Sequence, residues 1–502
     1  MTKKKGKTQI SGGGQIVLED IDVVTHKYMQ EYSTYVNMHR AIPDFYDGLK
    51  PVHRRLMYAA YELRSQGLVK TARVGGDCFG KYHPHGSPDS SMQTLVICEA
   101  PTMHGEGNWG NLIDKAAASR YTECKLSGYG ELFFQPNYIE KEITTFMANY
   151  DDTNVEPMTL PAPLPNVFIN SGEGIGVGLD TDIPTFTPES LVEVLTSILN
   201  REKPTAKDIH SKLKLAFPWG GRLKKTKENN IAFYDLIMTG RLGGKNNRSK
   251  GLVYEAPLIT DPVKKTIEIS EWPPGLNPVK FIDNIRELPE TGHITLLKGT
   301  QTYLIEMDKG YNINQFEQYV QAVQKEATTR QAYRINVVVS TFDGEDQHSV
   351  VRSMSVIEVL LAWLRKRLEI EMKSLKYRKA RVEEQIAYSK LLIYAASKVD
   401  VIVTIIRNKK ITDPDAEVAK QLKLSLEQAK QILSLQIRQL STLDEDKVKA
   451  RKGKQEEELA QIEKDLKDPR NRVIDSMNHA VQQIKRDKQV LERVTTQEVT
   501  LK

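Results

Sequence analysis

The 502-residue chain has few cysteines and no long hydrophobic run. Cys78, Cys98 and Cys124 form no CxxC pair and are too few for a disulfide framework, which is typical of a protein in a reducing cytosol. No apolar run approaches the roughly 18–20 residues that span a bilayer. The basic N-terminal stretch, MTKKKGKTQISGGGQ, lacks the apolar segment of a secretion signal. These absences argue against a disulfide-stapled secreted domain and against a membrane protein.

The chain also lacks a strong excess of either charge. Its 71 Lys and Arg residues stand against 65 Asp and Glu residues, for a net charge of +6. Attraction to a nucleic acid would therefore depend on a local basic patch rather than on the total charge. The length and the ordinary content of hydrophobic residues, 39%, allow two to four domains with a large core.

The composition and the predicted secondary structure of the sequence change twice along the chain. Residues from about 20 to 170 are dense in Gly, Pro, His and Arg, and residues from about 171 to 350 alternate short β-rich runs with turns, as in KTIEISEWPPGLNP and YRINVVVSTFDGED. In the helical remainder, apolar residues recur every seven positions: Leu361, Leu368, Leu375 and Val382, then Leu459, Leu466, Val473 and Ala480. This spacing predicts an out-and-back antiparallel coiled coil with a small helical knob, although two ordinary amphipathic helices would give a similar pattern.

A basic helix is predicted over residues 50–63, with Pro51 in its first turn and Gly67 past its end. At about 100° per residue, its apolar side chains form one stripe: Val52, Leu56, Ala59, Ala60 and Leu63. The cationic or titratable side chains point to the opposite side or flank the stripe: Lys50 and Arg54, then His53 and Arg55. We expect these groups to surround an exposed face, which either contacts phosphate or is simply solvated.

A second basic element follows in GKYHPHG, residues 80–86, where Lys81, His83 and His85 lie in a loop bounded by Gly and Pro. A helix is predicted to begin at about Asp89, and a helix start behind a basic loop is a ready anion site. Two polar helices joined by a turn outline a helix-turn-helix DNA-binding motif. Zinc binding by Cys78, the two histidines and His104 is disfavoured, because the spacing fits no standard pattern and a lysine lies between them.

The stretch KAAASRYTECKL, residues 115–126, places Tyr121 directly after Arg120. A tyrosine in such a run is most often a packing residue. A phenol with a pKa of about 10 becomes a useful nucleophile at neutral pH only beside a positive charge or a base. Arg120 provides a permanently charged phosphate donor one residue away. The basic elements upstream favour the interpretation of Tyr121 as a nucleophile over that of a packing residue.

Several motifs together resemble the DNA-cleaving subunit, known as A-type, of the type II topoisomerases, that is, of bacterial gyrase and topoisomerase IV. They come in the order and at close to the spacing of that family: RAIPDFYDGLKPVHRR (40–55), ARVGGDCFGKYHPHG (72–86), GEGNWGN (105–111), AAASRYTE (116–123), NSGEGIGVGLDTDIP (170–184) and LSLQIRQLSTLDEDK (433–447). The resemblance covers nearly the whole chain and is thinner between about residues 205 and 350.

The resemblance implies a multidomain α+β fold. We expect a flexible N-terminal arm over residues 1–28 and a winged-helix (helix-turn-helix) DNA-cleavage domain over residues 29–170. A mixed tower domain should occupy residues 171–352. The long antiparallel coiled coil should occupy residues 353–502 and carry a helical dimerisation gate at about residues 396–448.

The resemblance makes Tyr121 the nucleophile that forms a 5′-phosphotyrosine link to each strand of a duplex. Arg120 and Arg40 would stabilise the charge that develops on phosphorus, with Arg40 serving the site of a partner copy. Ile175 would be a wedge that enters between base steps and bends the DNA. Further DNA contacts are expected from the two basic elements: Lys50, His53, Arg54, Arg55, Lys81, His83 and His85.

Mg²⁺ and ATP are expected on a separate B-type subunit. The chain has no convincing Glu followed by an Asp-x-Asp pair, and GEGIGVG (172–178) lacks the Lys-Ser/Thr ending of a phosphate-binding loop. The resemblance implies a homodimer through the C-terminal gate, working in the cytoplasm of a prokaryote or on host DNA as a viral protein, with no membrane contact.

The chain ends at Lys502, soon after the returning helix, without strands for a β-propeller-like wrapping domain. We therefore expect ATP-dependent relaxation and decatenation rather than negative supercoiling. Two other classes share some features. A tyrosine recombinase usually has its nucleophile near the end of its catalytic domain, whereas Tyr121 lies early, and an architectural DNA-binding coiled-coil protein would leave no covalent DNA adduct.

Overall fold

The structure is a computed structural model of the 502-residue chain. It describes the following residues: 8–9, 15–16, 19–85, 88–99, 102–170, 172–200, 204–243, 249–343, 346–408, 411–434 and 445–487. Most of the motif at 433–447 and the last residues of the chain lie outside the described parts. The chain forms two compact units, one comprising Met1–Gln135, Thr144–Arg367 and Ile474–Lys502, the other Pro136–Ile143 and Leu368–Val473. Among the described residues, no helix combines the length and apolar character that a membrane span requires.

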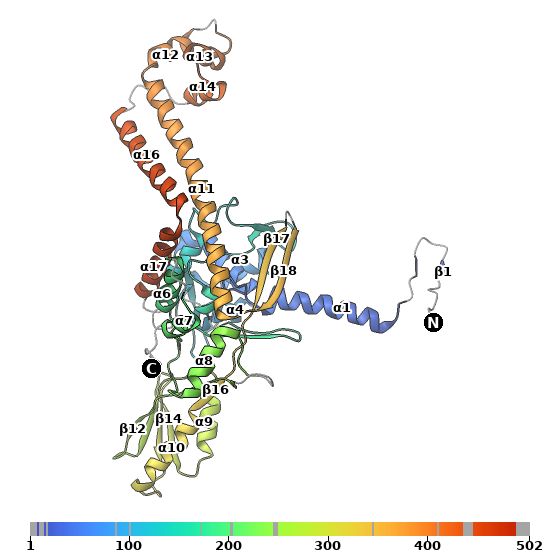
Figure 1. Ribbon diagram of the computed structural model, residues 1–502, viewed down its shortest axis with the longest axis vertical. Coiled ribbons are helices and arrows are strands. Elements are labelled where there is room, and N and C mark those ends of the chain that lie inside the picture. Colours follow the sequence, from blue (N-terminus) through green and yellow to red (C-terminus); the bar gives the residue numbers. More distant parts are fainter. Residues whose placement is uncertain are drawn as a thin grey trace. The chain divides into compact units, whose positions relative to one another are not determined.

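The first part of the first unit contains several helical segments and a small antiparallel sheet. The helical segments are α1 (Ile21–Val36), the π-helical turn η1 (Asn37–Ala41), α2 (Pro51–Glu62), α3 (Thr71–Lys81), α4 (Pro88–Gln93), η3 (Thr94–Glu99) and α5 (Gly128–Glu131), of which α1, α3 and α4 are labelled in Figure 1. The sheet has the order β3 (Val69–Lys70), β5 (Glu123–Leu126) and β4 (Met103–Glu106). The predicted basic helix is confirmed as α2, with Pro51 at its first position, where a missing N–H costs nothing. The expected domain boundary at residue 28 falls inside α1, a helix without buried residues.

The middle of the chain is mixed, and the expected strands in KTIEIS and YRINVVVS are present. The paired strands there are β6 (Phe146–Ala148) with β7 (Val155–Pro157), β8 (Gly172–Ile175) with β9 (Asp180–Ile183), and β17 (Asn336–Asp343) with β18 (Asp346–Ser353). Near the N-terminus, β1 (Thr8–Gln9) pairs with β2 (Gln15–Ile16). A further sheet has the order β10 (Arg222–Leu223), β11 (Leu252–Glu255), β16 (Thr328–Gln331). The accompanying helices are α6 (Pro188–Leu199), α7 (Ala206–Lys212) and α8 (Lys227–Thr239).

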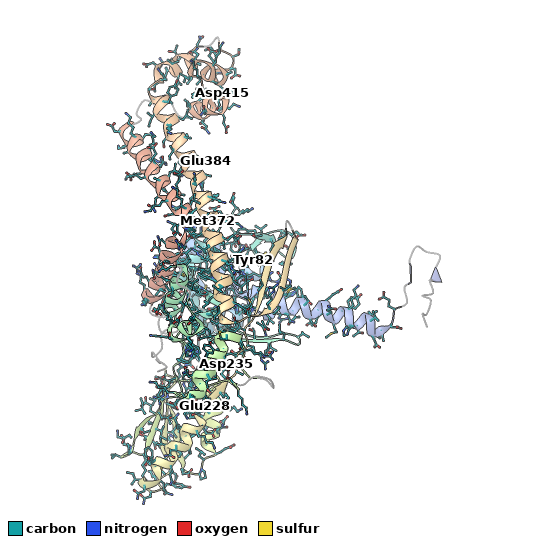
Figure 2. All side chains as sticks on the ribbon, in the orientation of Figure 1. Tyr82, Glu228, Asp235, Met372, Glu384 and Asp415 are labelled. Carbon is teal, nitrogen blue, oxygen red and sulfur yellow. The ribbon has the colours of Figure 1, made fainter. Side chains whose placement is uncertain are left out.

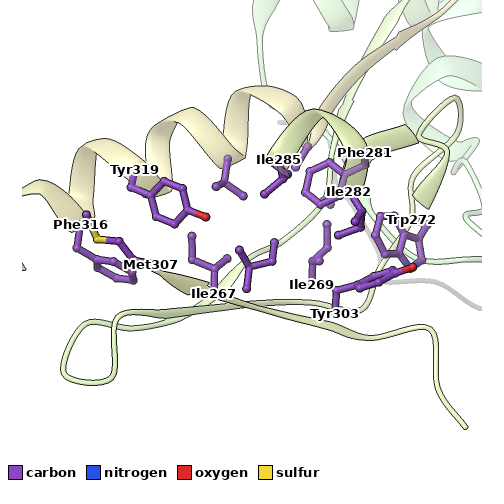
Figure 3. Close-up of a cluster of buried hydrophobic side chains, with 14 residues drawn as sticks. Ile267, Ile269, Trp272, Phe281, Ile282, Ile285, Tyr303, Met307, Phe316 and Tyr319 are labelled. Carbon is purple, nitrogen blue, oxygen red and sulfur yellow. The ribbon is translucent and has the colours of Figure 1, made fainter. Parts of the chain in front are cut away.

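A four-stranded antiparallel sheet carries its own core. Its order is β12 (Ile259–Asp261), β13 (Thr266–Ile269), β15 (Tyr303–Met307) and β14 (Thr291–Leu296). Helices α9 (Pro278–Arg286) and α10 (Phe316–Glu326) cover one face, and their apolar side chains meet those of the strands (Figure 3). Alternate residues of β13 and β15 point into this cluster, as the two-residue period of a half-buried strand requires. Trp272 closes one end of it and donates its indole N–H to the carbonyl of Gln301 at 2.9 Å.

The second unit is built on two long helices that pack side by side, α11 (Val356–Ala396) and α16 (Glu445–Lys467). Leu375, Val382 and Ile386 form a buried seam with Ile462. Arg378 pairs with Glu458 and Ser389 with Gln455, so residue numbers fall along α16 as they rise along α11, and the two helices are antiparallel. The expectation that Leu361 belongs to the seam is wrong, because its side chain is 36% exposed. The remaining helix, α17 (Arg470–Arg486), follows α16 after Pro469.

Three short helices form a separate cluster in the second unit. They are α12 (Val399–Arg407), α13 (Pro414–Leu422) and α14 (Leu426–Leu433). Their buried side chains pack with the last turns of α11: Leu391, Ala395, Ile402, Ile405, Val418, Leu422, Ala429 and Ile432. Side chains of Asp413 and Ser425 cap the starts of α13 and α14, which fixes where each helix begins.

Candidate functional site

Tyr121 lies on an exposed turn immediately before strand β5. Its amide donates to the carbonyl of Ala118 at 2.8 Å, and 64% of its surface is exposed. The guanidinium carbon of Arg120 lies 4.7 Å from the centre of the Tyr121 ring, within the range of a cation–π contact. The interpretation of Tyr121 as a packing residue is therefore wrong. The turn presents a phenol and a permanent positive charge to solvent side by side.

The start of helix α3 holds this turn in place. The α3 amides of Thr71 and Ala72 donate to the carbonyls of Thr122 and Ser119 at 3.0 and 3.2 Å. The Thr122 hydroxyl also donates to that of Thr71 at 2.9 Å, with both side chains buried. No side chain caps α3 at Lys70, so the turn satisfies helix donors that would otherwise lack partners. The backbone on both sides of Tyr121 is thus fixed while its side chain faces solvent.

Two predicted DNA-contacting residues of helix α2 are buried instead of exposed. Arg54 donates through Nε and Nη2 to the two carboxylate oxygens of Asp47, at 2.6 and 3.0 Å. Asp47 is fully buried and also accepts the amides of Leu49 and Leu160 at 3.0 and 2.9 Å. His53 is buried as well. The predicted exposed face is wrong at both positions. Arg54 is covered by Asp47 and Leu49 of the segment that precedes the helix.

Arg55 joins a carboxylate to a histidine ring. Its Nε and Nη2 donate to Oε2 and Oε1 of Glu156 at 2.6 and 2.7 Å, and its Nη1 lies 2.8 Å from Nδ1 of His83. Glu156 belongs to β7 and is only 2% exposed. Burial, followed by the positive charges of Arg55, His85 and Arg40, lowers the pKa of His83 to about 4. His83 is therefore neutral at pH 7.

Lys81 and His85 are at least partly exposed, although Lys81 ends helix α3 instead of lying in the predicted loop. The rings of His83 and His85 lie 6.2 Å apart, and Arg40 is exposed on η1. Lys81 donates to Glu62 at 3.1 Å across a partly exposed ion pair. The neighbouring Tyr82 (Figure 2) is buried and donates its hydroxyl to the same carboxylate at 2.9 Å. This contact ties the loop to the end of α2.

Ile175 stands out from the β8–β9 hairpin with 81% of its surface exposed. Lys50 supports the hairpin by donating to the carbonyl of Glu173 at 2.6 Å. Asn37 supports its loop by bonding both the amide and the carbonyl of Val177, at 2.8 and 3.2 Å. A Cβ on Gly174 would lie 2.1 Å from the carbonyl oxygen of Ala41, so only glycine allows the hairpin to approach η1 this closely.

The structure therefore brings some predicted residues together and separates others. Arg55 and His83 form one bonded cluster, with the charges of Arg40 and His85 near the ring. Among the described side chains, Tyr121 and Arg120 make no hydrogen bond or ion pair with that cluster. Sequence reasoning missed Asp47, Glu156 and Asn37. Only the Asp47 contact could have been suspected from the sequence, because Asp47 lies just seven residues before its partner Arg54.

The described residues contain no group of three or more His, Cys, Asp and Glu side chains that could hold a metal ion. Two of the residues considered for zinc binding, Cys78 and His104, have other surroundings. Cys78 is buried, and His104 lies 3.5 Å from the carboxylate of Asp487.

Comparison with known proteins places these features in one family. The family model for the A-type subunit of DNA gyrase/topoisomerase IV matches residues 40–481. The A-type subunit of DNA topoisomerase 4 from Rickettsia felis is 30% identical over 475 residues, covering 90% of this chain and 62% of the relative. The corresponding protein of Haemophilus influenzae is 30% identical over 88% of this chain and 58% of the relative. The A-type subunit of DNA gyrase from Aminobacterium colombiense is 30% identical over 93% and 56%.

The chain thus spans less than two thirds of the length of each of these relatives. The matched region nevertheless includes Tyr121, the Arg55–His83 cluster and the Ile175 hairpin. With a mixed helix and strand architecture and a family match over most of its length, the chain belongs to the family of the A-type subunits of DNA gyrase and topoisomerase IV.

Proposed function

We propose that this chain is the DNA breakage-and-reunion subunit of a type IIA topoisomerase, with Tyr121 as its nucleophile. The observation that carries the proposal is the geometry of the turn: an exposed phenol beside the Arg120 guanidinium, on a backbone anchored to α3. Family membership supports the same assignment, because the relatives are named as DNA topoisomerase 4 and DNA gyrase subunits.

In the proposed reaction, the Tyr121 hydroxyl oxygen attacks a backbone phosphorus. A phosphorus–oxygen bond to tyrosine forms, the bond to the 3′ oxygen of the neighbouring nucleotide breaks, and the phenol proton leaves as the 3′ oxygen is protonated. Arg120, and Arg40 from a partner copy, stabilise the charge on phosphorus in the transition state. The ester that forms resembles the ester that breaks, so the strand can be resealed by the reverse attack.

DNA binding is proposed to use the basic and apolar groups that the structure leaves accessible. Lys81, His85 and Arg40 would meet phosphates, and such contacts make affinity depend on salt. The Ile175 side chain would wedge between base steps and favour bent DNA. Arg54 has no place in this surface, because its guanidinium is committed to a buried pair with Asp47.

We propose that this chain works in a two-subunit, dimeric enzyme. Helices α2, α3 and α4 next to the β3–β5–β4 sheet are consistent with a winged-helix domain, and the antiparallel α11 and α16 pair with an α12–α14 cluster is consistent with a coiled coil and gate. We propose that a second copy joins through that gate. A B-type subunit would supply ATP hydrolysis and Mg²⁺, in the cytoplasm of a prokaryote or of a virus-infected cell.

Covalent capture of DNA tests the proposal. The chain is incubated with plasmid DNA, Mg²⁺ and B-type subunits of bacterial gyrase or topoisomerase IV, then denatured with detergent and digested with protease. Double-strand breaks with protein on the 5′ ends are the expected result. Attachment at 3′ ends would indicate a recombinase, and DNA binding without any adduct would indicate an architectural protein; either result would overturn the assignment.

A further inference from the structure

The contacts around His83 decide which of its ring nitrogens carries hydrogen. The Arg55 guanidinium has N–H donors and no acceptor, so a nitrogen 2.8 Å from its Nη1 must offer a lone pair. That nitrogen is Nδ1. In a neutral imidazole the proton then resides on Nε2, which is left as the ring's single donor.

Burial and nearby charges keep the His83 ring neutral. Burial of the ring disfavours a second proton most, followed by Arg55 from α2, His85 from the same loop and Arg40 from η1. The pKa of about 4 lies well below neutral pH. Phe79 of α3, which carries no charge, contacts the ring edge-on with 5.6 Å between centroids.

Arg55 can keep its Nη1 directed at His83 only if its guanidinium group is itself held in place. An arginine side chain loses considerable rotamer freedom when it is fixed. Glu156 accepts from Nε and Nη2 with both carboxylate oxygens, which leaves Nη1 directed at His83. The two residues are 101 positions apart, and the Arg55 and Glu156 side chains are 19% and 3% exposed. A bidentate, nearly buried pair of this kind has a defined geometry.

We propose that Glu156 is a positioning residue that, through Arg55, fixes the His83 ring with Nδ1 as acceptor and Nε2 as its only N–H. His83 then offers a hydrogen-bond donor to an anion, such as a DNA phosphate oxygen, and does not exchange protons with it. Glu156 itself touches no DNA. The consequence for DNA cleavage rests on the proposed function, whereas the state of the ring is a property of the chain alone.

The ring is tested first, without DNA. Long-range ¹H–¹⁵N NMR spectra of the full chain labelled with ¹⁵N-histidine report the tautomer, and the His83 signals are those lost in His83→Gln. We expect wild-type His83 to show a protonated Nε2 and a bare Nδ1 from pH 8 to pH 6. In Glu156→Gln the bidentate pair that directs Arg55 at Nδ1 is broken, and His83 should show a mixture of its two neutral tautomers.

Two further variants make this result specific. Arg55→Lys replaces the planar guanidinium with a point charge and should mix the two His83 tautomers as Glu156→Gln does, which gives a second test if one of the variants folds poorly. Glu255→Gln removes a carboxylate that pairs with Arg222 at 2.8 Å elsewhere in the same unit and should leave the His83 signals unchanged. A proton on Nδ1 in wild type, or His83 spectra in Glu156→Gln identical to wild type, would overturn the proposal.

Cleavage is tested second, with Mg²⁺ and the B-type partner. Glu156→Gln should lower the rate of covalent capture at least tenfold while DNA affinity stays within twofold, and Glu255→Gln should match wild type. A Glu156→Gln enzyme with altered His83 spectra but a normal cleavage rate would refute the positioning role. Absence of capture by the wild type would refute the proposed function instead, and the NMR result would still decide the state of His83.

Discussion

At the scale of single residues, the exposed phenol of Tyr121 carries the proposed chemistry. Tyr121→Phe removes only the hydroxyl, so we expect DNA binding to persist while covalent capture falls to background. Tyr150→Phe is a matched control, because Tyr150 is also exposed, at 51%, in the same unit. Gel-shift and detergent-capture assays measure the two properties. Capture by the Tyr121→Phe protein above that of a DNA-only sample would show that another group is the nucleophile.

The buried pair of Arg54 and Asp47 belongs to stability rather than to DNA binding. Asp47→Ala would leave the Arg54 charge buried without its partner and the amides of Leu49 and Leu160 without an acceptor. We expect a loss of about 3–5 kcal/mol in the free energy of unfolding.

Arg54→Met in the Asp47→Ala background removes the orphaned charge and should restore part of the stability. Urea unfolding of the single and double variants forms a double-mutant cycle that measures the coupling. Additive losses would show that the two side chains do not depend on each other.

Asp44 gives the fold a dependence on pH. Burial, and next the nearby carboxylate of Asp47, raise its pKa from 3.8 to about 7, against the opposing effect of Arg54. Between these values the folded chain holds a proton that the unfolded chain has released, so stability falls as pH rises through 7.

Asp44→Asn removes this proton uptake while keeping an acceptor for the amide of Tyr46, which bonds Asp44 at 2.8 Å. We expect the wild type to lose more unfolding free energy than this variant between pH 6 and pH 8, as measured by denaturant unfolding at each pH. Parallel pH profiles of the two proteins would mean that Asp44 is ionised across the whole range.

At the scale of elements, the seam between α11 and α16 should control the stability of the second unit. Ile462 is nearly fully buried in it, so Ile462→Ala should lower local stability by about 2–5 kcal/mol. Leu361→Ala, at a more exposed position of α11, should cost less than about 1 kcal/mol. Native-state hydrogen exchange of α11 and α16 peptides in the full chain measures both. Equal effects of the two substitutions would show that the seam is not the contact that stabilises the second unit.

At the scale of the whole molecule, the proposed strand passage would need a B-type partner as well as this chain. We expect the assembly of this chain with a B-type subunit to relax supercoiled plasmid and to unlink catenated circles only with ATP and Mg²⁺. Each of the two proteins by itself, and an assembly carrying Tyr121→Phe, serve as controls. Gel electrophoresis of the DNA products gives the result. ATP-independent relaxation by the assembly would contradict a mechanism in which nucleotide hydrolysis in the partner drives passage.

The sequence by itself determined the features that depend on neighbours a few positions away. Pro51 set the start of α2, and alternation of apolar residues set strands such as β13. The motifs around Tyr121 also sufficed to identify the family, since their order and spacing are written in the chain. Helical periodicity found Leu375 and Val382 of the buried α11 and α16 seam but missed Ile386 and Ile462, and it did not show the exposure of Leu361.

Only the tertiary structure decided how the charges are used. A helical wheel places Arg54 away from the apolar stripe, yet the preceding segment brings Asp47 over that side and buries the pair. Glu156 is 101 residues from Arg55, so no local pattern could predict their contact or the state of His83 that follows from it. Periodicity reports which side of an element is apolar. What covers the other side depends on chain segments that approach from far away in the sequence.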